Sequence, residues 1–239
     1  MDRRTFLASS LAAVLPVPSG LKKLVAAYSD RLSQAQDNAL VWRDGTRMAW
    51  SDGRAKSFDE KLAHPDLSDQ LSIAYAPGPI AAAPSVNQDP GRIRYQPFFE
   101  KMYGASEAQV RANLVPVRWA PAAKDFLVTR VNGIDRLLAE IGKEIANMPD
   151  SVARFARAPA GSFNYRDVAG TRAKSGHAFG IAFDIDSRLS RYWRWDRPMR
   201  WRGEVPYALV EAFERRKFIW GGKWYHYDTM HFEYRPELF

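Results

Sequence analysis

The sequence of 239 residues contains no cysteine. Disulfides, thiolate metal sites and cysteine nucleophiles are therefore excluded, and stability must come from a hydrophobic core. Any metal ion would have to be held by histidine, aspartate or glutamate. Histidine is itself scarce, and the chain has only four: His64, His177, His226 and His231.

Long hydrophobic runs are also missing. The apolar run near the N-terminus extends from Phe6 to Leu15, which is too short to span a bilayer and typical of the apolar region of a signal peptide. Arg3 and Arg4 precede it, and together with the following Thr-Phe-Leu they resemble a twin-arginine export signal. We therefore expect a signal peptide at residues 1–22, export to the periplasm and no stable membrane insertion. A short amphipathic N-terminal helix is the alternative interpretation.

Acidic residues are too few to balance the basic ones. The formal net charge is +8 and the isoelectric point is about 9.7. Such a balance suits nucleic acid, a membrane surface or a polyanionic cell envelope, although a solvated basic surface is the simpler explanation. The basic residues are spread along the chain without a nucleic-acid-binding motif, so no nucleic-acid partner is predicted.

The patterning predicts an α+β fold with a small, mainly antiparallel sheet packed with helices. Asp44-Gly45 lies between two apolar arms and indicates a hairpin over residues 39–50. Ser106 has the form of a helix cap. The other expected elements are a stretch with helical potential at 57–74, a Pro/Ala-rich loop at 76–91, an edge strand at 114–119, helices at 122–148 and 206–217, and strands at 181–186 and 230–234.

The stretch SGHAFGIAFDID, residues 175–186, carries acids on one face of a predicted strand. Inward-facing Asp184 is costly unless a positive charge lies nearby. Two imidazoles and one carboxylate are a sufficient protein set for a catalytic Zn²⁺ ion, which would supply that charge. Glycines flank His177 and allow the chain to turn it back toward Asp184. Asp228, close to His231, is placed to act as a general base.

The wider pattern resembles the M15 family of zinc peptidases, which comprises D-alanyl-D-alanine carboxypeptidases and related peptidoglycan endopeptidases. Three motifs carry the resemblance, which spans about residues 120–239. The S-x-H-x-x-G-x-A-x-D motif is matched by Ser175, His177, Gly180, Ala182 and Asp184, the [DE]-x-x-H motif by Asp228 and His231, and the W-G-G-x-W motif by residues 220–224.

The resemblance implies particular roles. It makes His177, Asp184 and His231 the zinc ligands and Asp228 the general base, and it suggests that Arg166 contacts the substrate carbonyl or the developing oxyanion. Arg172 competes with Arg166 for that role. Carboxypeptidase members usually carry glutamate at the base position, so aspartate there favours the branch that cleaves L-alanyl-D-glutamate bonds.

For several other residues the sequence allows more than one role. Glu233 could act as base or orient a ligand, Asp186 is expected to be a surface acid or a partner of a ligand, and His226 to line the pocket. His64 is expected in a loop. Trp220 and Trp224 are expected to pack in the core or form an aromatic wall, and Tyr165 and Tyr227 are left undecided.

We therefore expect a zinc peptidase domain at residues 111–239, preceded by an extension of unknown role at 23–110. Its substrates would be peptidoglycan peptides. A catalytically inactive module of the same fold, binding wall peptide or zinc, is the alternative. No oligomeric state is predicted.

Overall fold

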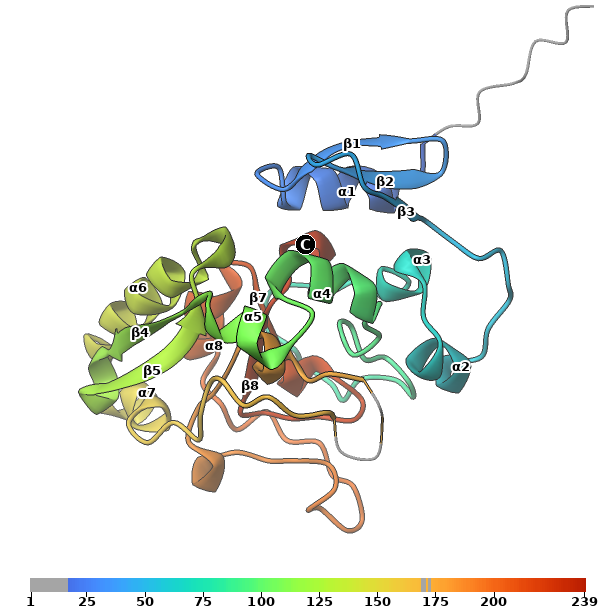
Figure 1. Ribbon diagram of the computed structural model, residues 1–239. Coiled ribbons are helices and arrows are strands. Elements are labelled where there is room, and N and C mark those ends of the chain that lie inside the picture. The colour runs from blue at the N-terminus through green and yellow to red at the C-terminus, as the bar shows by residue number, and fades with distance from the viewer. Residues whose placement is uncertain (1–16, 169–170, 172) are drawn as a thin grey trace, which may run out of the picture.

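The computed structural model describes residues 17–168, 171 and 173–239 (Figure 1). Most of the expected signal peptide, including Arg3 and Arg4, and the candidate Arg172 lie outside the described residues. The fold is α+β with three small antiparallel sheets, which confirms the predicted class. Within the described chain, no helix combines the length and apolarity needed to cross a membrane.

A three-stranded antiparallel sheet lies in the C-terminal part. It contains β6 (Ala182–Asp184), β7 (Phe218–Trp220) and β8 (His231–Tyr234), in the order β6-β8-β7. The predicted strands at 181–186 and 230–234 are thus confirmed, with shorter bounds. The register pairs Asp184 with His231. Residues directly opposite each other in an antiparallel pair project to the same face, so the register alone brings these two side chains together.

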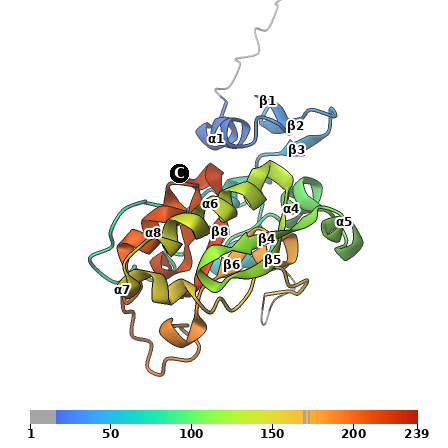
Figure 2. The ribbon, with the colours of Figure 1, turned by 90° about the vertical axis from the view of Figure 1, so that its left-hand side faces the viewer.

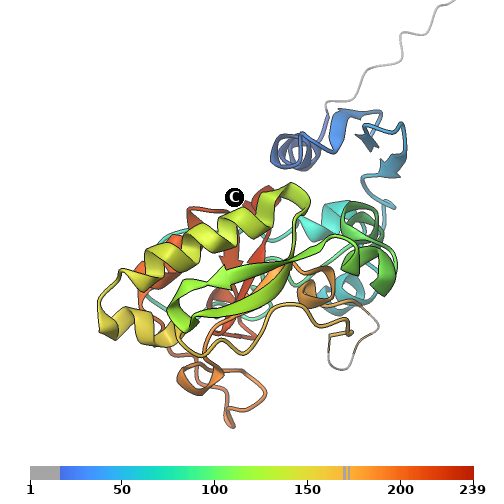
Figure 3. The same cartoon turned by 60° about the vertical axis from the view of Figure 1, so that its left-hand side comes forward.

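A hairpin and a long helix cover this sheet (Figures 2 and 3). Strands β4 (Leu114–Trp119) and β5 (Lys124–Thr129) form the hairpin, and α6 (Ile134–Ala146) packs along β4. Beyond α6 come α7 (Asp150–Ala153) and α8 (Tyr207–Glu214), both in contact with α6. The predicted strand at 114–119 and the predicted helix at 206–217 are confirmed, the helix with shorter bounds.

The predicted helix over 122–148 is wrong before Ile134, over nearly half of its length. Residues 124–129 form β5, and the helix begins only at Ile134. Ala123 and Asn132 both have left-handed backbone angles, with φ of 48° and 58°, which interrupt a helix on either side of the strand. Leu127, which the predicted helix would bury together with Val131 and Ile134, is 41% exposed, and pairing with β4 determines the conformation of this segment instead.

From residue 17 on, the N-terminal half contains α1 (Ser19–Ala27) and a sheet of β1 (Leu32–Gln36), β2 (Ala39–Trp42) and β3 (Arg47–Ala49). Pairing of β2 with β3 confirms the predicted hairpin, whereas β1 was not predicted. Four short helices follow: α2 (Phe58–Ala63), α3 (Leu67–Gln70), α4 (Gln96–Tyr103) and α5 (Glu107–Arg111). The stretch 57–74 is therefore two helices, the segment 76–91 is free of helix and strand as predicted, and Ser106 caps α5.

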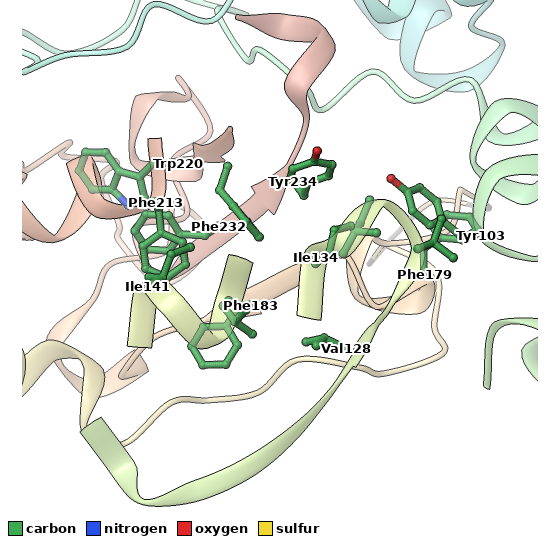
Figure 4. Close-up of a cluster of buried hydrophobic side chains, with 14 of the residues drawn as sticks. Tyr103, Val128, Ile134, Ile141, Phe179, Phe183, Phe213, Trp220, Phe232 and Tyr234 are labelled. Carbon is green, nitrogen blue, oxygen red and sulfur yellow. The ribbon is translucent and has the colours of Figure 1, made fainter. Parts of the chain in front are cut away.

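One hydrophobic core joins the two halves. Phe99 of α4 stacks on Phe179, with ring centroids 5.7 Å apart, and α1 packs against the C-terminal residues Pro236–Leu238. At the other end of the same core, Phe213 stacks on Phe232 at 3.8 Å (Figure 4). Residues 23–110 thus contribute side chains to the core that supports the C-terminal sheet.

Candidate metal centre

His177 lies in a short 3₁₀ turn, Gly176–Phe179, directly before β6. The Ser175 hydroxyl caps this turn by accepting a hydrogen bond from the His177 backbone N–H at 3.3 Å. Gly180 ends the turn with a φ of 68°, a conformation that glycine adopts without strain. The turn between the two glycines therefore brings His177 back toward the strand that carries Asp184, as the sequence predicted.

Three ligand atoms converge beside the C-terminal sheet. His177 Nε2 lies 3.2 Å from His231 Nδ1, and Asp184 Oδ1 lies 3.1 Å from each of them. Ligand atoms around a tetrahedral zinc with bonds of about 2.0–2.1 Å lie ~3.3 Å apart. The three sides of the triangle match this spacing, so the predicted ligands do form a group that could hold a metal ion.

Each histidine is oriented by an acceptor behind it. His177 Nδ1 donates to the Ser162 carbonyl oxygen at 2.5 Å, and His231 Nε2 donates to the Glu233 carboxylate at 3.1 Å. In the neutral rings these bonds leave the lone pairs of His177 Nε2 and His231 Nδ1 directed at Asp184. Three acceptors then face one another with no proton between them, an arrangement that a cation stabilises. The donor set therefore fits zinc.

The electrostatics of the triangle also favour a cation. Burial alone would raise the pKa of Asp184, but the two histidines outweigh it and hold that pKa well below its usual range. Burial lowers the pKa of His231, whereas the carboxylates of Asp184 and Glu233 outweigh burial and raise it to about 10. Without a metal, the His231 ring therefore holds a second proton near neutral pH, and metal binding must displace it.

Asp228, the predicted base, lies at the turn that leads into β8 and lines the same cavity. Its Oδ1 atom is buried and has no hydrogen-bond partner among the residues that the structure describes. Burial, assisted by the negative charge of Asp184, raises the pKa of Asp228 to about 7. A buried carboxylate with a free oxygen and such a pKa is suited to accept a proton near neutral pH.

The cavity at the triangle is small, with a volume of about 100 Å³. Arg166 lines it, as do Arg92 and Arg94 from the N-terminal half. The Arg166 guanidinium is exposed and donates to the neighbouring Asp167 carbonyl oxygen at 3.3 Å, so it lies at the rim. Cationic groups therefore line an opening next to the triangle of acceptors.

Asp186 and the other two histidines lie outside the triangle. Asp186 pairs with Arg188, accepting hydrogen bonds at 2.6 and 2.9 Å. His226 lines the cavity wall, where its Nδ1 lies 2.6 Å from the Asp89 carboxylate. His64 is exposed at the end of α2.

Of the four aromatic residues singled out in the sequence, Trp224 lines the cavity and the other three pack elsewhere. Trp220 and Trp224 are buried and donate from their indole nitrogens to backbone carbonyl oxygens, and the Trp224 ring lies 5.4 Å from that of His231. Tyr227 is buried and donates to Asp196 at 2.7 Å. The ring of Tyr165 lies under the ammonium group of Lys174, 4.7 Å away.

Sequence reasoning missed the residues that support the histidines. Ser162 acts through its backbone carbonyl, for which no residue type is diagnostic. Asp89, Arg92 and Arg94 come from a segment far away in the sequence. The proximity of Glu233 to His231 along the strand was the one available signal, and the Glu233 carboxylate does bond to the His231 ring.

Comparison with known proteins places residues 169–234 within a peptidase M15 family model described as D-alanyl-D-alanine carboxypeptidase. This match confirms the resemblance to M15 peptidases over that segment. It includes all three residues of the triangle and Asp228. No curated protein and no solved structure matches the chain.

Proposed function

We propose that the protein is an exported zinc peptidase that hydrolyses peptide bonds in the stem peptide of peptidoglycan. The observation that carries this proposal is the triangle of His177, Asp184 and His231, with sides of 3.1–3.2 Å, inside the segment that matches the peptidase family. These three residues would hold Zn²⁺. When bound, zinc would polarise the scissile carbonyl and lower the pKa of the attacking water.

The chain's own groups supply the remaining chemistry. Asp228 would take the proton of the attacking water on its free Oδ1 and pass it to the leaving amine. Arg166, at the rim of the cavity, would contact the carbonyl oxygen as negative charge develops on it. Glu233 is less suited to the role of base, because its carboxylate is engaged by Arg94, Arg235 and His231.

Two observations point to different scissile bonds. The family model carries the description of a D-alanyl-D-alanine carboxypeptidase, whereas aspartate at position 228 favours an L-alanyl-D-glutamate endopeptidase. Two substrates distinguish these activities. One is a muropeptide ending in D-Ala-D-Ala, and the other is a muropeptide with an accessible L-Ala-D-Glu bond. Loss of a terminal alanine, detected by mass, identifies the carboxypeptidase. Release of an L-alanine-ended fragment identifies the endopeptidase.

Replacing Asp228 by asparagine tests the mechanism. Asparagine keeps the size and polarity of the side chain but cannot accept the proton, so we expect turnover to fall ~10²–10⁴-fold while zinc content stays the same. Asp186→Asn is the matched control, since Asp186 pairs with Arg188 instead, and it should retain activity. Rates are measured with the two muropeptides and zinc by elemental analysis.

Two outcomes would change this assignment. Wild-type turnover in Asp228→Asn would remove the base role from Asp228. A wild-type protein that holds zinc and binds the muropeptides but cleaves neither would instead support the inactive binding module.

The proposed export rests on Arg3, Arg4 and the apolar run after them. Replacing both arginines by lysine should leave the full-length precursor in the cytoplasm, because the twin-arginine pair is read by a receptor. Fractionation and immunoblotting measure this. Unchanged appearance of the protein in the periplasm would contradict the twin-arginine route.

A further inference from the structure

The segment 89–94 of the N-terminal half runs beside the metal centre. The Pro90 carbonyl oxygen accepts a hydrogen bond from the Trp224 indole at 2.6 Å, and the Gly91 carbonyl oxygen accepts one from Arg235 at 2.7 Å. Both donors lie close to β8 in the sequence. The backbone of this segment is thereby fixed against the strand that carries His231.

Arg94, at the end of this segment, forms a two-pronged ion pair with Glu233. Its Nε donates to Oε1 at 3.0 Å, and its terminal nitrogen donates to Oε2. The Glu233 side chain is fully buried and that of Arg94 is 9% exposed, so solvent screens the pair little. A planar guanidinium bonded to both carboxylate oxygens determines the plane of the carboxylate.

That plane determines which way Glu233 faces. Oε2 accepts the hydrogen bond from His231 Nε2, while Oε1 is also bonded to Arg235 at 3.2 Å. Gly176, the residue before His177, leaves the room for this carboxylate, because a Cβ atom there would lie 2.6 Å from Glu233 Oε2. Glu233 therefore lies between the two segments that carry the histidines.

Resting on the zinc centre proposed above, we propose that Arg94 is a positioning residue, which holds Glu233 in the orientation that makes Nδ1 of His231 available as a metal ligand. The N-terminal half then completes a metal centre whose ligands all come from the C-terminal half. Without Arg94, Glu233 would keep the bond from Arg235 on Oε1 and the bond from His231 on Oε2, but no group would fix the plane of the carboxylate, and Oε2 could rotate away from His231.

Zinc affinity of the full chain tests this proposal without requiring turnover. The dissociation constant is measured by competition with a chromophoric chelator for wild type, Arg94→Gln, Arg94→Lys and Arg118→Gln. Loss of a group that orients a metal ligand typically weakens metal binding about 10–100-fold, so we expect that loss in Arg94→Gln. Lysine should restore part of it, since it keeps the charge but not the two-pronged geometry.

Arg118→Gln is the matched control, because Arg118 forms an exposed ion pair with Asp125 on the β4–β5 hairpin. It should bind zinc like the wild type. Circular dichroism and the melting temperature of each metal-free variant check that a weaker affinity does not reflect unfolding. Wild-type affinity in folded Arg94→Gln would overturn the proposal.

Glu233→Gln and the double variant provide a second measurement. The double variant combines Arg94→Gln with Glu233→Gln. If Arg94 acts through Glu233, its zinc affinity should be about that of the single variant with the lower affinity, because the two residues act as one unit. Additive losses would contradict this mechanism. A wild-type protein that fails to bind zinc would refute the zinc centre itself, a result distinct from an Arg94 variant that binds normally.

Discussion

The C-terminal segment 169–234 and the N-terminal half contribute to the same site in different ways. The C-terminal segment supplies all three atoms of the triangle and the candidate base within fewer than sixty residues. The N-terminal half supplies no ligand atom to this triangle, but its Arg92 and Arg94 line the same cavity, and its Asp89 pairs with His226 in the cavity wall. The three atoms of the triangle thus come from one short stretch, while part of the cavity wall and the ion-pair partner of Glu233 come from the N-terminal half.

The two regions also differ in charge at the site. Asp184, Asp228 and Glu233 bring negative charge into a buried space from the C-terminal segment. Arg94 brings positive charge back from the N-terminal half, where it pairs with Glu233. Burying a carboxylate is unfavourable unless it is paired and hydrogen-bonded, so the two regions are electrostatically interdependent.

Removing a ligand should have the largest effect. We expect His177→Ala to lose stoichiometric zinc, because two ligands rarely hold an ion that needs three from the protein. His64→Ala is the control from the N-terminal half, where His64 is exposed on α2, and it should retain zinc. Elemental analysis of the purified proteins measures both. Stoichiometric zinc in His177→Ala would show that the ion is held elsewhere.

Removing a core contact between the two regions should have a smaller effect, on stability. Phe99 is fully buried in α4 and stacks on Phe179, which belongs to the turn that carries His177. Phe99→Ala should lower the free energy of unfolding by about 3–5 kcal/mol. Urea denaturation, followed by tryptophan fluorescence, measures the loss.

Two further variants make this comparison sharper. Phe99→Leu leaves a smaller cavity and should lose less stability, which keeps the test usable if the alanine variant does not fold. Val86→Ala changes an exposed side chain of the N-terminal half and should stay within about 0.5 kcal/mol of the wild type. Separate unfolding transitions for the two halves would contradict a shared core.

The grouping of the three residues of the triangle was predictable because their signals are local. His177 and Asp184 lie seven positions apart around a turn with glycine at both ends, and His231 alternates with apolar residues in a strand. The β4–β5 hairpin was less accessible to such reasoning. Leu127 of its second strand lies at helical spacing from Val131 and Ile134, and only pairing with residues 114–119 decides against the helix.

By itself, the sequence determined the kind of donors available: without cysteine, a metal ion could be held only by histidine, aspartate or glutamate, and the resemblance to M15 peptidases singled out His177, Asp184 and His231. Only the tertiary structure decided how that set is held. The pairing of Asp184 with His231 depends on strand register, and the approach of Arg94 to Glu233 joins positions 139 residues apart. Contacts over such separations depend on how the whole core packs, and no local pattern of residue types encodes them.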